Sequence, residues 1–396
     1  MCLPNKLKIA LLNSPGSKVV TLWEHSHLAM AALAALESNL PSLRPETFND
    51  RFGSSFGNQD QWERIASTGF SDTSIFRLTT SQGAFAIRSW PSDGASWDKV
   101  HFWDLLQRND SFRPFPKLIR WCGHSIDQSL LFAYGNKLWS LSDWIEGRPL
   151  QLSDLTLDRV RELATILAKI HVATIELLQS EAMPPPSHRP SEEQELGGSR
   201  TLIERSQFLA TVDHSWDTGV KHSEFYRKHK LVDPLLLCLS KIQKVKNLWT
   251  EQLDRSSRIR RRYHWIVRDL WYENVLVSSS GDFSSIVDLG AARFDWPGLD
   301  FTRLFGSIMV LACSQSWNIF DTSNWWDNAY AAYISNHPTH SLGPVQECID
   351  LNEIATALSV IQWIKWIESG VVRFNSQEDE NRVAHRINQL CQTISW

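Results

Sequence analysis

Three oxygen-bearing side chains fall within twenty residues in the second half of the chain. Asp269, Asn274 and Asp288 lie in the stretch 263–304, in the order D-x-x-x-x-N and then D-x-G. In phosphoryl transfer, a carboxylate orients and deprotonates the attacking hydroxyl, and hard oxygen ligands hold Mg²⁺ against the phosphates. These residue types indicate a phosphoryl-transfer site. The alternative is an ordinary hairpin with Asp and Asn at its turns, where both residues are common.

A strand hairpin is expected to position these side chains. Residues 275–277 and 285–287 are short runs dominated by β-branched and apolar residues, and the polar turn 279–282 lies between them. Such a pattern predicts two short strands joined by a turn. The first aspartate would then lie on the loop that leads into the hairpin, and the other two side chains would lie at the strand ends.

Strand-like runs also dominate the chain from residue 61 onward, at 62–67, 73–79 and 83–90. The small, polar connection 67–73 contains one glycine and could lay backbone N–H groups over phosphates, although such a loop is often only a turn. A linker at 141–147 closes this β-rich lobe, and a nucleotide's base commonly binds at such a place.

Arg88 lies in the third of these runs. Strand alternation places it on the face opposite Phe85 and Ile87. A cation beneath a small-residue loop could pair with nucleotide phosphates. The alternative is a solvent-facing arginine, which is the common case on a sheet.

The chain of 396 residues is long enough for two or three domains, or for one two-lobed unit with a sizeable core. An N-terminal extension (1–48, with a possible helix at 28–40) precedes a β-rich nucleotide-binding lobe with a hinge (49–147) and a helical lobe (148–396). Residues 183–200 read as an exposed insertion. Helical patterns span 95–107, 153–178, 202–212, 223–227, 234–253, 300–313, 325–336, 350–368 and 378–393.

Composition excludes several classes of protein. With 42% apolar and 21% charged residues and a formal net charge of −4, the chain gives no reason to expect a nucleic-acid partner. The one basic run, 255–262, is typical of a solvated loop or helix end, with nucleic-acid contact as the alternative. Six scattered cysteines form no C-x-x-C pair, which argues against a zinc site or a disulfide framework. Without an 18-residue apolar stretch or a signal-peptide core, we expect a cytoplasmic protein with no membrane partner.

In this order and spacing, the parts resemble the aminoglycoside phosphotransferase and choline-kinase-like family of small-molecule kinases. The resemblance covers roughly residues 60 to 395, and its motifs are VRDLWYEN (267–274), IVDLG (286–290) and DFTRL (300–304). It implies an α+β, bilobal, protein-kinase-like fold. A small antiparallel β-rich lobe would precede a larger, mainly helical one.

The resemblance also implies roles for individual residues. Asp269 matches the catalytic aspartate, Asn274 and Asp288 match the metal ligands, and Arg88 looks like the strand cation. Asp300 looks like a buried aspartate that braces the catalytic loop. The nucleotide loop and hinge would be represented by Gly69, Phe70, Ser71, Thr73, Trp144 and Ile145.

Two departures from the family pattern leave an alternative open. Val267 stands where the family usually has a histidine that supports the loop, and no clear helix glutamate faces Arg88, because Asp98 or His101 occupies that region. We expect an ATP- (or GTP-) and Mg²⁺-dependent phosphotransferase acting on a small-molecule hydroxyl, with Asp269 as the base. The alternative is a non-catalytic nucleotide-binding or scaffolding protein, a pseudokinase. A protein kinase is disfavoured, because only eleven residues separate Asp288 from Asp300.

The acceptor is expected over the C-terminal helices, near 313–330 and 350–368. Aromatic and acidic residues there would suit a cationic acceptor. The alternative is ordinary helix packing beside a solvated acidic face. The residues concerned are Trp317, Trp325, Trp326, Asp327, Asp350 and Glu353.

Overall fold

The computed structural model describes most of the chain from Trp62 onward. The described residues are 62–65, 73–80, 83–107, 114–119, 130–134, 137–179, 198–313, 322–337, 342–372, 374 and 376–394. The predicted N-terminal extension, its helix and most of the predicted insertion lie outside these residues. The chain divides into two compact units, one formed by 1–67, 71–104 and 116–145, and the other by 68–70, 105–115 and 146–396.

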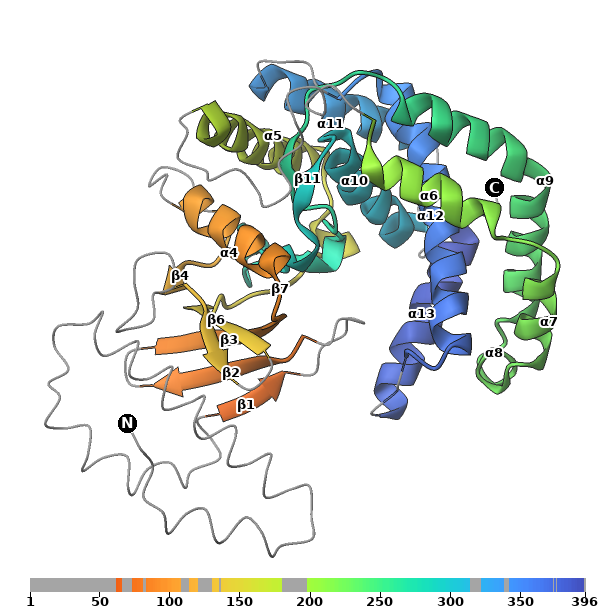
Figure 1. Cartoon of the computed structure of the whole chain (residues 1–396), viewed down its shortest axis with the longest axis horizontal. Helices are drawn as coiled ribbons and strands as arrows, with labels where there is room; N and C mark the ends of the chain where they lie inside the picture. The colour runs from red at the N-terminus through yellow and green to blue at the C-terminus, as the bar shows by residue number, and fades with distance from the viewer. Residues whose placement is uncertain are drawn as a thin grey trace, which may run out of the picture. The chain divides into compact units, whose positions relative to one another are not determined.

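The first unit is built on an antiparallel sheet of six strands, in the order β1-β2-β3-β6-β4, with β5 paired to β6 (Figure 1). Alternation explains its core: Phe76 and Leu78 point inward from one strand, and Phe85 and Ile87 from its neighbour. The elements are β1 Trp62–Ile65, β2 Ile75–Thr80, β3 Gly83–Pro91, α4 Gly94–Gln107, β4 Leu118–Ile119, β5 Phe132–Tyr134 and β6 Lys137–Asp143.

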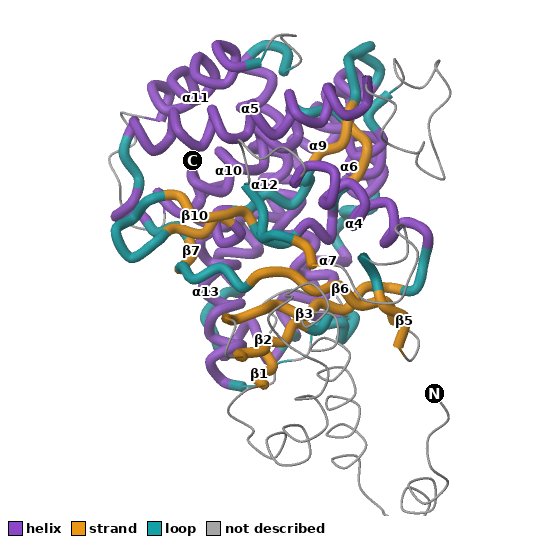
Figure 2. The backbone as a smooth tube through the Cα atoms, turned by 90° about the vertical axis from the view of Figure 1, so that its left-hand side faces the viewer, coloured by secondary structure: helices purple, strands orange, loops and turns teal. Residues whose placement is uncertain are grey.

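The second unit is mainly helical (Figure 2). Within it α11 packs on α5, α6 on α9, α10 on α12, and α12 on α13. The helices are α5 Leu157–Gln179, α6 Arg200–Ala210, α7 Ser215–His222, α8 Glu224–Lys228, α9 Val232–Ser257, α10 Gly298–Cys313, α11 Thr322–Asn336, α12 Val345–Glu368 and α13 Gln377–Ile394. No helix among the described residues is long and apolar enough to cross a membrane.

Short strands in the second unit carry the stretch that the sequence singled out. One small sheet has the order β10-β9-β7 and another pairs β11 with β8. The strands are β7 Arg148–Pro149, β8 His264–Ile266, β9 Val275–Val277, β10 Phe283–Ile286 and β11 Arg293–Asp295. The predicted α+β chain, with an antiparallel sheet followed by helices, is therefore confirmed.

Two local differences from the sequence predictions have physical causes. The helix predicted from residue 153 begins at Leu157, because Asp154 is held in a 3-10 turn by Arg148 (2.6 and 2.7 Å) and by the Gln151 amide (2.8 Å). Helix α7 was not predicted. It contains Gly219, a poor helix former, at a position where an added Cβ would meet the Glu368 carboxylate.

Candidate active site

The predicted hairpin is confirmed and brings Asn274 and Asp288 to one end. Strands β9 and β10 pair antiparallel, and the Val287 amide donates to the Asn274 carbonyl at 2.8 Å. The second strand starts earlier than expected, at Phe283, and an irregularity in its register follows. Because Val287 lies opposite Asn274, the next side chain, Asp288, emerges beside the asparagine.

Asp288 has a left-handed backbone, with φ of 66° and ψ of 70°. It begins a 3-10 turn, Leu289–Ala291, and its Oδ1 accepts a hydrogen bond from the Gly290 amide at 3.1 Å. Non-glycine residues rarely adopt this conformation, and those that do are concentrated at functional sites. The D-x-G spacing thus has a structural reason, because the glycine amide fixes the carboxylate.

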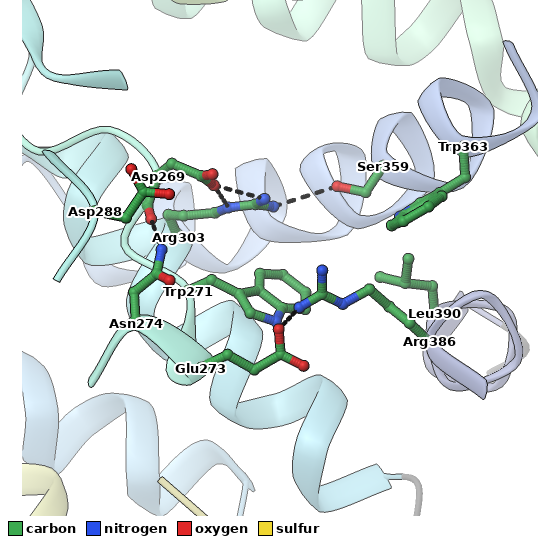
Figure 3. A pocket seen from close by; sticks show the side chains of 10 residues that line it. All are labelled: Asp269, Trp271, Glu273, Asn274, Asp288, Arg303, Ser359, Trp363, Arg386 and Leu390. Atoms are coloured by element: carbon green, nitrogen blue, oxygen red, sulfur yellow. Dashed lines mark hydrogen bonds and ion pairs between the residues drawn. The ribbon is translucent and has the colours of Figure 1, made fainter. Parts of the chain in front are cut away.

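Asn274 links the metal-ligand candidates to the loop that carries Asp269. Its Nδ2 donates to the Asp269 carbonyl at 2.9 Å, so its Oδ1 is available as a ligand. Together with Asp288, the two residues line a cavity of about 110 Å³, shown in Figure 3. The other lining residues are Trp271, Glu273, Arg303, Ser359, Trp363, Arg386 and Leu390.

The loop before Asp269 is held in place by a buried carboxylate. Asp300, on α10, accepts hydrogen bonds from the amides of Val267 (2.7 Å) and Arg268 (2.5 Å) and is fully buried. Burial raises the pKa of Asp300 to about 7, and the two amide hydrogen bonds act in the opposite direction. The bracing role that the resemblance implied for Asp300 is confirmed.

A histidine from a distant helix contacts this brace. His171, on α5, places Nε2 at 3.2 Å from Asp300 Oδ2 and Nδ1 at 2.6 Å from the Tyr333 hydroxyl. Burial, together with neighbouring His337, holds the pKa of His171 well below its ordinary value, so the ring is neutral. The loop therefore has a supporting histidine although Val267 replaces the usual one, because His171 contacts the Asp300 carboxylate that holds the loop.

Asp269 forms an ion pair that the sequence analysis missed. Arg303, on α10, donates from Nη2 (3.0 Å) and Nε (3.3 Å) to Asp269 Oδ1, and its Nη1 donates to Ser359 Oγ at 3.3 Å. The Asp269 side chain is 48% exposed. Among the described residues, Oδ2 accepts no hydrogen bond, so this oxygen is available to a ligand.

Two guanidinium groups flank the indole of Trp271. Arg303 lies 4.5 Å and Arg386 5.2 Å from the ring centroid, and Arg386 also pairs with Glu273 (Figure 3). Cations at this distance from an indole are attracted by its π face. The arrangement keeps two positive charges beside the cavity that Asp269, Asn274 and Asp288 line.

Asp269 also lines a second, larger cavity of about 540 Å³. Arg303 and Ser359 are shared between the two cavities. Helices α6 and α12 supply most of the remaining wall. Its other residues are Thr201, Glu204, Arg205, Phe208, Arg268, Ala291, Ala355, Leu358, Gln362 and Trp366.

The structure also shows where most of the predicted nucleotide-binding residues lie. Arg88 is only 9% exposed and its guanidinium stands 4.6 Å from the Trp90 ring, so the solvent-facing alternative is wrong. Thr73 precedes β2 and is half-buried. Trp144 is half-buried beneath the Arg77 guanidinium (4.9 Å), and Ile145 is the last residue of the first unit. Gly69, Phe70 and Ser71 lie outside the described residues.

Of the residues expected around the acceptor, those that the structure describes line neither of these cavities. Trp325 and Trp326 are buried, and Trp326 packs against Phe301 at 5.9 Å between ring centroids. Asp350 accepts hydrogen bonds from glutamine side chains, whereas Asp327 is exposed. Glu353 is exposed too, and Trp317 lies outside the described residues. Ordinary helix packing beside a solvated acidic face describes these residues, and α12 faces the larger cavity with other residues.

One of the missed residues had a readable signal. Arg303 follows Asp300 by three residues on one helix, so the two side chains lie on the same face of that helix. If Asp300 contacts the loop that carries Asp269, Arg303 must also lie close to that loop. Arg205 and Arg386 had none, because their helices reach the site only through packing against elements far away in the sequence.

Comparisons with known proteins agree with this fold. Residues 62–335 match the model of the phosphotransferase enzyme family. A search of curated proteins found no significant match. Among solved structures, amicoumacin kinase hAmiN in complex with AMP-PNP, Ca²⁺ and Ami is similar at 11% identity, 84% coverage of this chain, 88% of that chain and a TM-score of 0.52.

A second structure, spectinomycin phosphotransferase in complex with ADP and spectinomycin, is 10% identical, with 84% of this chain and 92% of that chain covered and a TM-score of 0.50. At these identities the likeness shows the fold alone. The family model, by contrast, matches more than half of the sequence. The chain therefore belongs to the phosphotransferase enzyme family, the aminoglycoside phosphotransferase and choline-kinase-like group that its motifs resemble.

Proposed function

We propose that the protein is an ATP- and Mg²⁺-dependent kinase that transfers the γ-phosphate to a hydroxyl of a small molecule. The observation that carries this proposal is the position of Asp269, which lines both cavities. A general base must reach the acceptor hydroxyl on one side and stand next to the transferred phosphate on the other. Asn274 and Asp288 line the smaller cavity, so that side is assigned to the metal and phosphates.

The smaller cavity suits Mg²⁺. Mg²⁺ prefers oxygen ligands and is commonly held by one or two protein groups together with substrate phosphates and water. Asn274 presents Oδ1 because its amide nitrogen is engaged, and Asp288 presents its carboxylate. No group of three or more His, Cys, Asp or Glu among the described residues could hold a metal, so we expect the phosphates to complete the site. Bound Mg²⁺ would neutralise charge on the phosphates.

The remaining nucleotide contacts are assigned to residues earlier in the chain. In this proposal Arg88 pairs with phosphate, Gly69, Phe70, Ser71 and Thr73 form the loop over it, and Trp144 with Ile145 contacts the base of ATP (or GTP). The solved structures named above contain AMP-PNP with Ca²⁺ and ADP, which supports a nucleotide ligand for this fold.

The larger cavity is assigned to the acceptor. Its volume of about 540 Å³ falls in the range of small-molecule sites, about 300–1,000 Å³. An acceptor hydroxyl placed there can donate its proton to Asp269 Oδ2 while Arg303 holds Oδ1. The chain's own contribution to the step is thus orientation of the hydroxyl and removal of its proton, on a loop that Asp300 keeps in place.

Loss of the metal-binding carboxylate provides a first test. Asp288→Ala should weaken Mg·ATP binding at least about 10-fold, because even outer partners of metal ligands contribute that much. Binding is measured by thermal shift with Mg·ATP, ATP alone and Mg²⁺ alone. Asp282→Ala removes an exposed carboxylate from the same hairpin and should bind normally. If Asp288→Ala kept full metal-dependent binding, the assignment of this residue would be wrong.

Arg303 should act on turnover rather than on nucleotide binding. Arg303→Gln should lower kcat about 10- to 100-fold with little change in KM for ATP, because a misplaced base loses about that factor. Arg303→Lys keeps the charge but not the two-point contact, so its kcat should lie between those of the wild type and Arg303→Gln. Steady-state ADP release separates kcat from KM. A wild-type kcat for Arg303→Gln would show that Asp269 needs no such partner.

Screening for phosphotransfer separates this proposal from the non-catalytic alternative. The screen measures Mg·ATP-dependent ADP release with hydroxylated amines, sugars and hydroxy acids. Turnover of any class would support a kinase. Metal-dependent nucleotide binding without turnover across the panel would favour a pseudokinase.

A further inference from the structure

The charged residues of the larger cavity are predominantly basic. Arg205, Arg268 and Arg303 line it, against the two carboxylates of Glu204 and Asp269. An acidic lining, as expected for a cationic acceptor, is not what these helices provide. The balance depends on which of these charges are already neutralised within the protein.

Both carboxylates are already paired. Glu204 receives Arg293 Nη1 at 2.9 Å and Arg200 Nε at 3.0 Å, and Arg268 Nη2 lies at 3.5 Å. Asp269 receives Arg303, as described above. The negative charge of each carboxylate is therefore already balanced by at least one arginine, which weakens its attraction for an ammonium group.

Arg205 is the basic group left over. It lies on α6, its Nη1 is buried, and among the described residues this atom has no hydrogen-bond partner. No carboxylate of the described residues forms an ion pair with it. Burial and the nearby charges of Arg303 and Arg268 lower the pKa of Arg205 to about 10, so it remains protonated at neutral pH.

Arg205 is half-buried as a whole, but its Nη1 has lost water without gaining a partner, which is unfavourable. An oxyanion would supply a missing acceptor, and arginine binds carboxylates and phosphates through two parallel hydrogen bonds. The site therefore has a defined chemical complement: an anionic group on a ligand of the larger cavity.

We infer that the acceptor is an anionic molecule, whose carboxylate or phosphate group binds Arg205 while its hydroxyl reaches Asp269. The inference rests on the proposed kinase function and specifies its substrate class. The cavity wall also includes the apolar and aromatic side chains of Phe208, Leu358 and Trp366. A flat or apolar body between the hydroxyl and the anion would fit that wall.

Four probes with the same body and hydroxyl test the charge preference. They are meta-(hydroxymethyl)benzoate, meta-(hydroxymethyl)phenyl phosphate, the neutral meta-(hydroxymethyl)benzamide and the cationic meta-(hydroxymethyl)benzylamine. Their binding to the full chain is measured by calorimetry without nucleotide, and their turnover by ADP release. At least one of the two anions should bind about 10- to 100-fold more tightly than the amide, the range expected for hydrogen bonds to a charged partner. The two anions distinguish a carboxylate site from a phosphate site.

Arg205→Gln should abolish this preference, and Arg205→Lys should restore part of it. Arg260→Gln, which removes an exposed arginine, is the matched control and should behave as wild type. Two results would overturn the inference. One is that the amine binds as tightly as both anions or more tightly. The other is that Arg205→Gln leaves unchanged the affinity of both anions relative to the benzamide.

Failure of the inference and failure of the kinase proposal give different results. A kinase that phosphorylates the amide or amine independently of Arg205 would refute only the anionic acceptor. Arg205-dependent anion binding without nucleotide binding or turnover would refute only the kinase.

Discussion

Asp269→Asn should lower kcat for phosphotransfer by about 10²–10⁴-fold, the range expected for loss of a general base. Asparagine has nearly the shape of aspartate but cannot take up the acceptor proton. Its side chain can still lie beside Arg303, and the backbone carbonyl that accepts from Asn274 is unchanged. Mg·ATP binding, measured by thermal shift, should therefore stay close to that of the wild type.

The comparison needs a variant with the same charge change outside the site. Asp282→Asn removes an exposed carboxylate from the turn of the same hairpin and should keep full activity. A variant Asp269→Asn with wild-type kcat would exclude this carboxylate as the base, whatever its effect on KM.

Asp300→Ala should destabilise the second unit by about 2–6 kcal/mol, because it leaves two amides, one buried and one part-buried, without an acceptor at about 1–3 kcal/mol each. The amides are those of Val267 and Arg268, and His171 would lose its contact as well. Urea unfolding followed by circular dichroism reports on this unit, since it is mainly helical.

Asp300→Asn keeps one side-chain acceptor, so its free energy of unfolding should lie between those of the wild type and Asp300→Ala. This variant provides a measurement even if the alanine variant does not fold. Asp327→Ala, on the exposed face of α11, should stay within about 0.5 kcal/mol of wild type. Should Asp300→Ala unfold at the wild-type urea concentration, the loop would have to be held by something other than this carboxylate.

The anionic acceptor that we infer has the opposite charge to the one that the sequence favoured. Tryptophans and acidic residues were expected to bind a cation, but Trp325 and Trp326 are core residues. These helices are indeed rich in aromatic and acidic residues, but a helix presents only part of its surface to a cavity. Which part depends on the neighbouring helices, and these come from distant parts of the chain.

Local chemistry made several features predictable from sequence. Strand alternation and turn residues indicated the sheet of the first unit and the β9–β10 hairpin, because these depend on neighbouring residues. Spacing along the hairpin was enough to expect Asn274 and Asp288 together. The 3-10 turn held by Arg148 and helix α7 were missed, because their stability comes from contacts rather than from periodicity.

By itself, the sequence determined most of the order of the elements, the hairpin and the family motifs that carry Asp269, Asn274 and Asp288. Only the tertiary structure decided that Arg303 pairs with Asp269 and that Arg205 is left without a carboxylate in the larger cavity. The physical reason is that backbone hydrogen bonding and turn preferences act between residues close in sequence. Charge pairing and burial, in contrast, depend on which helices pack together.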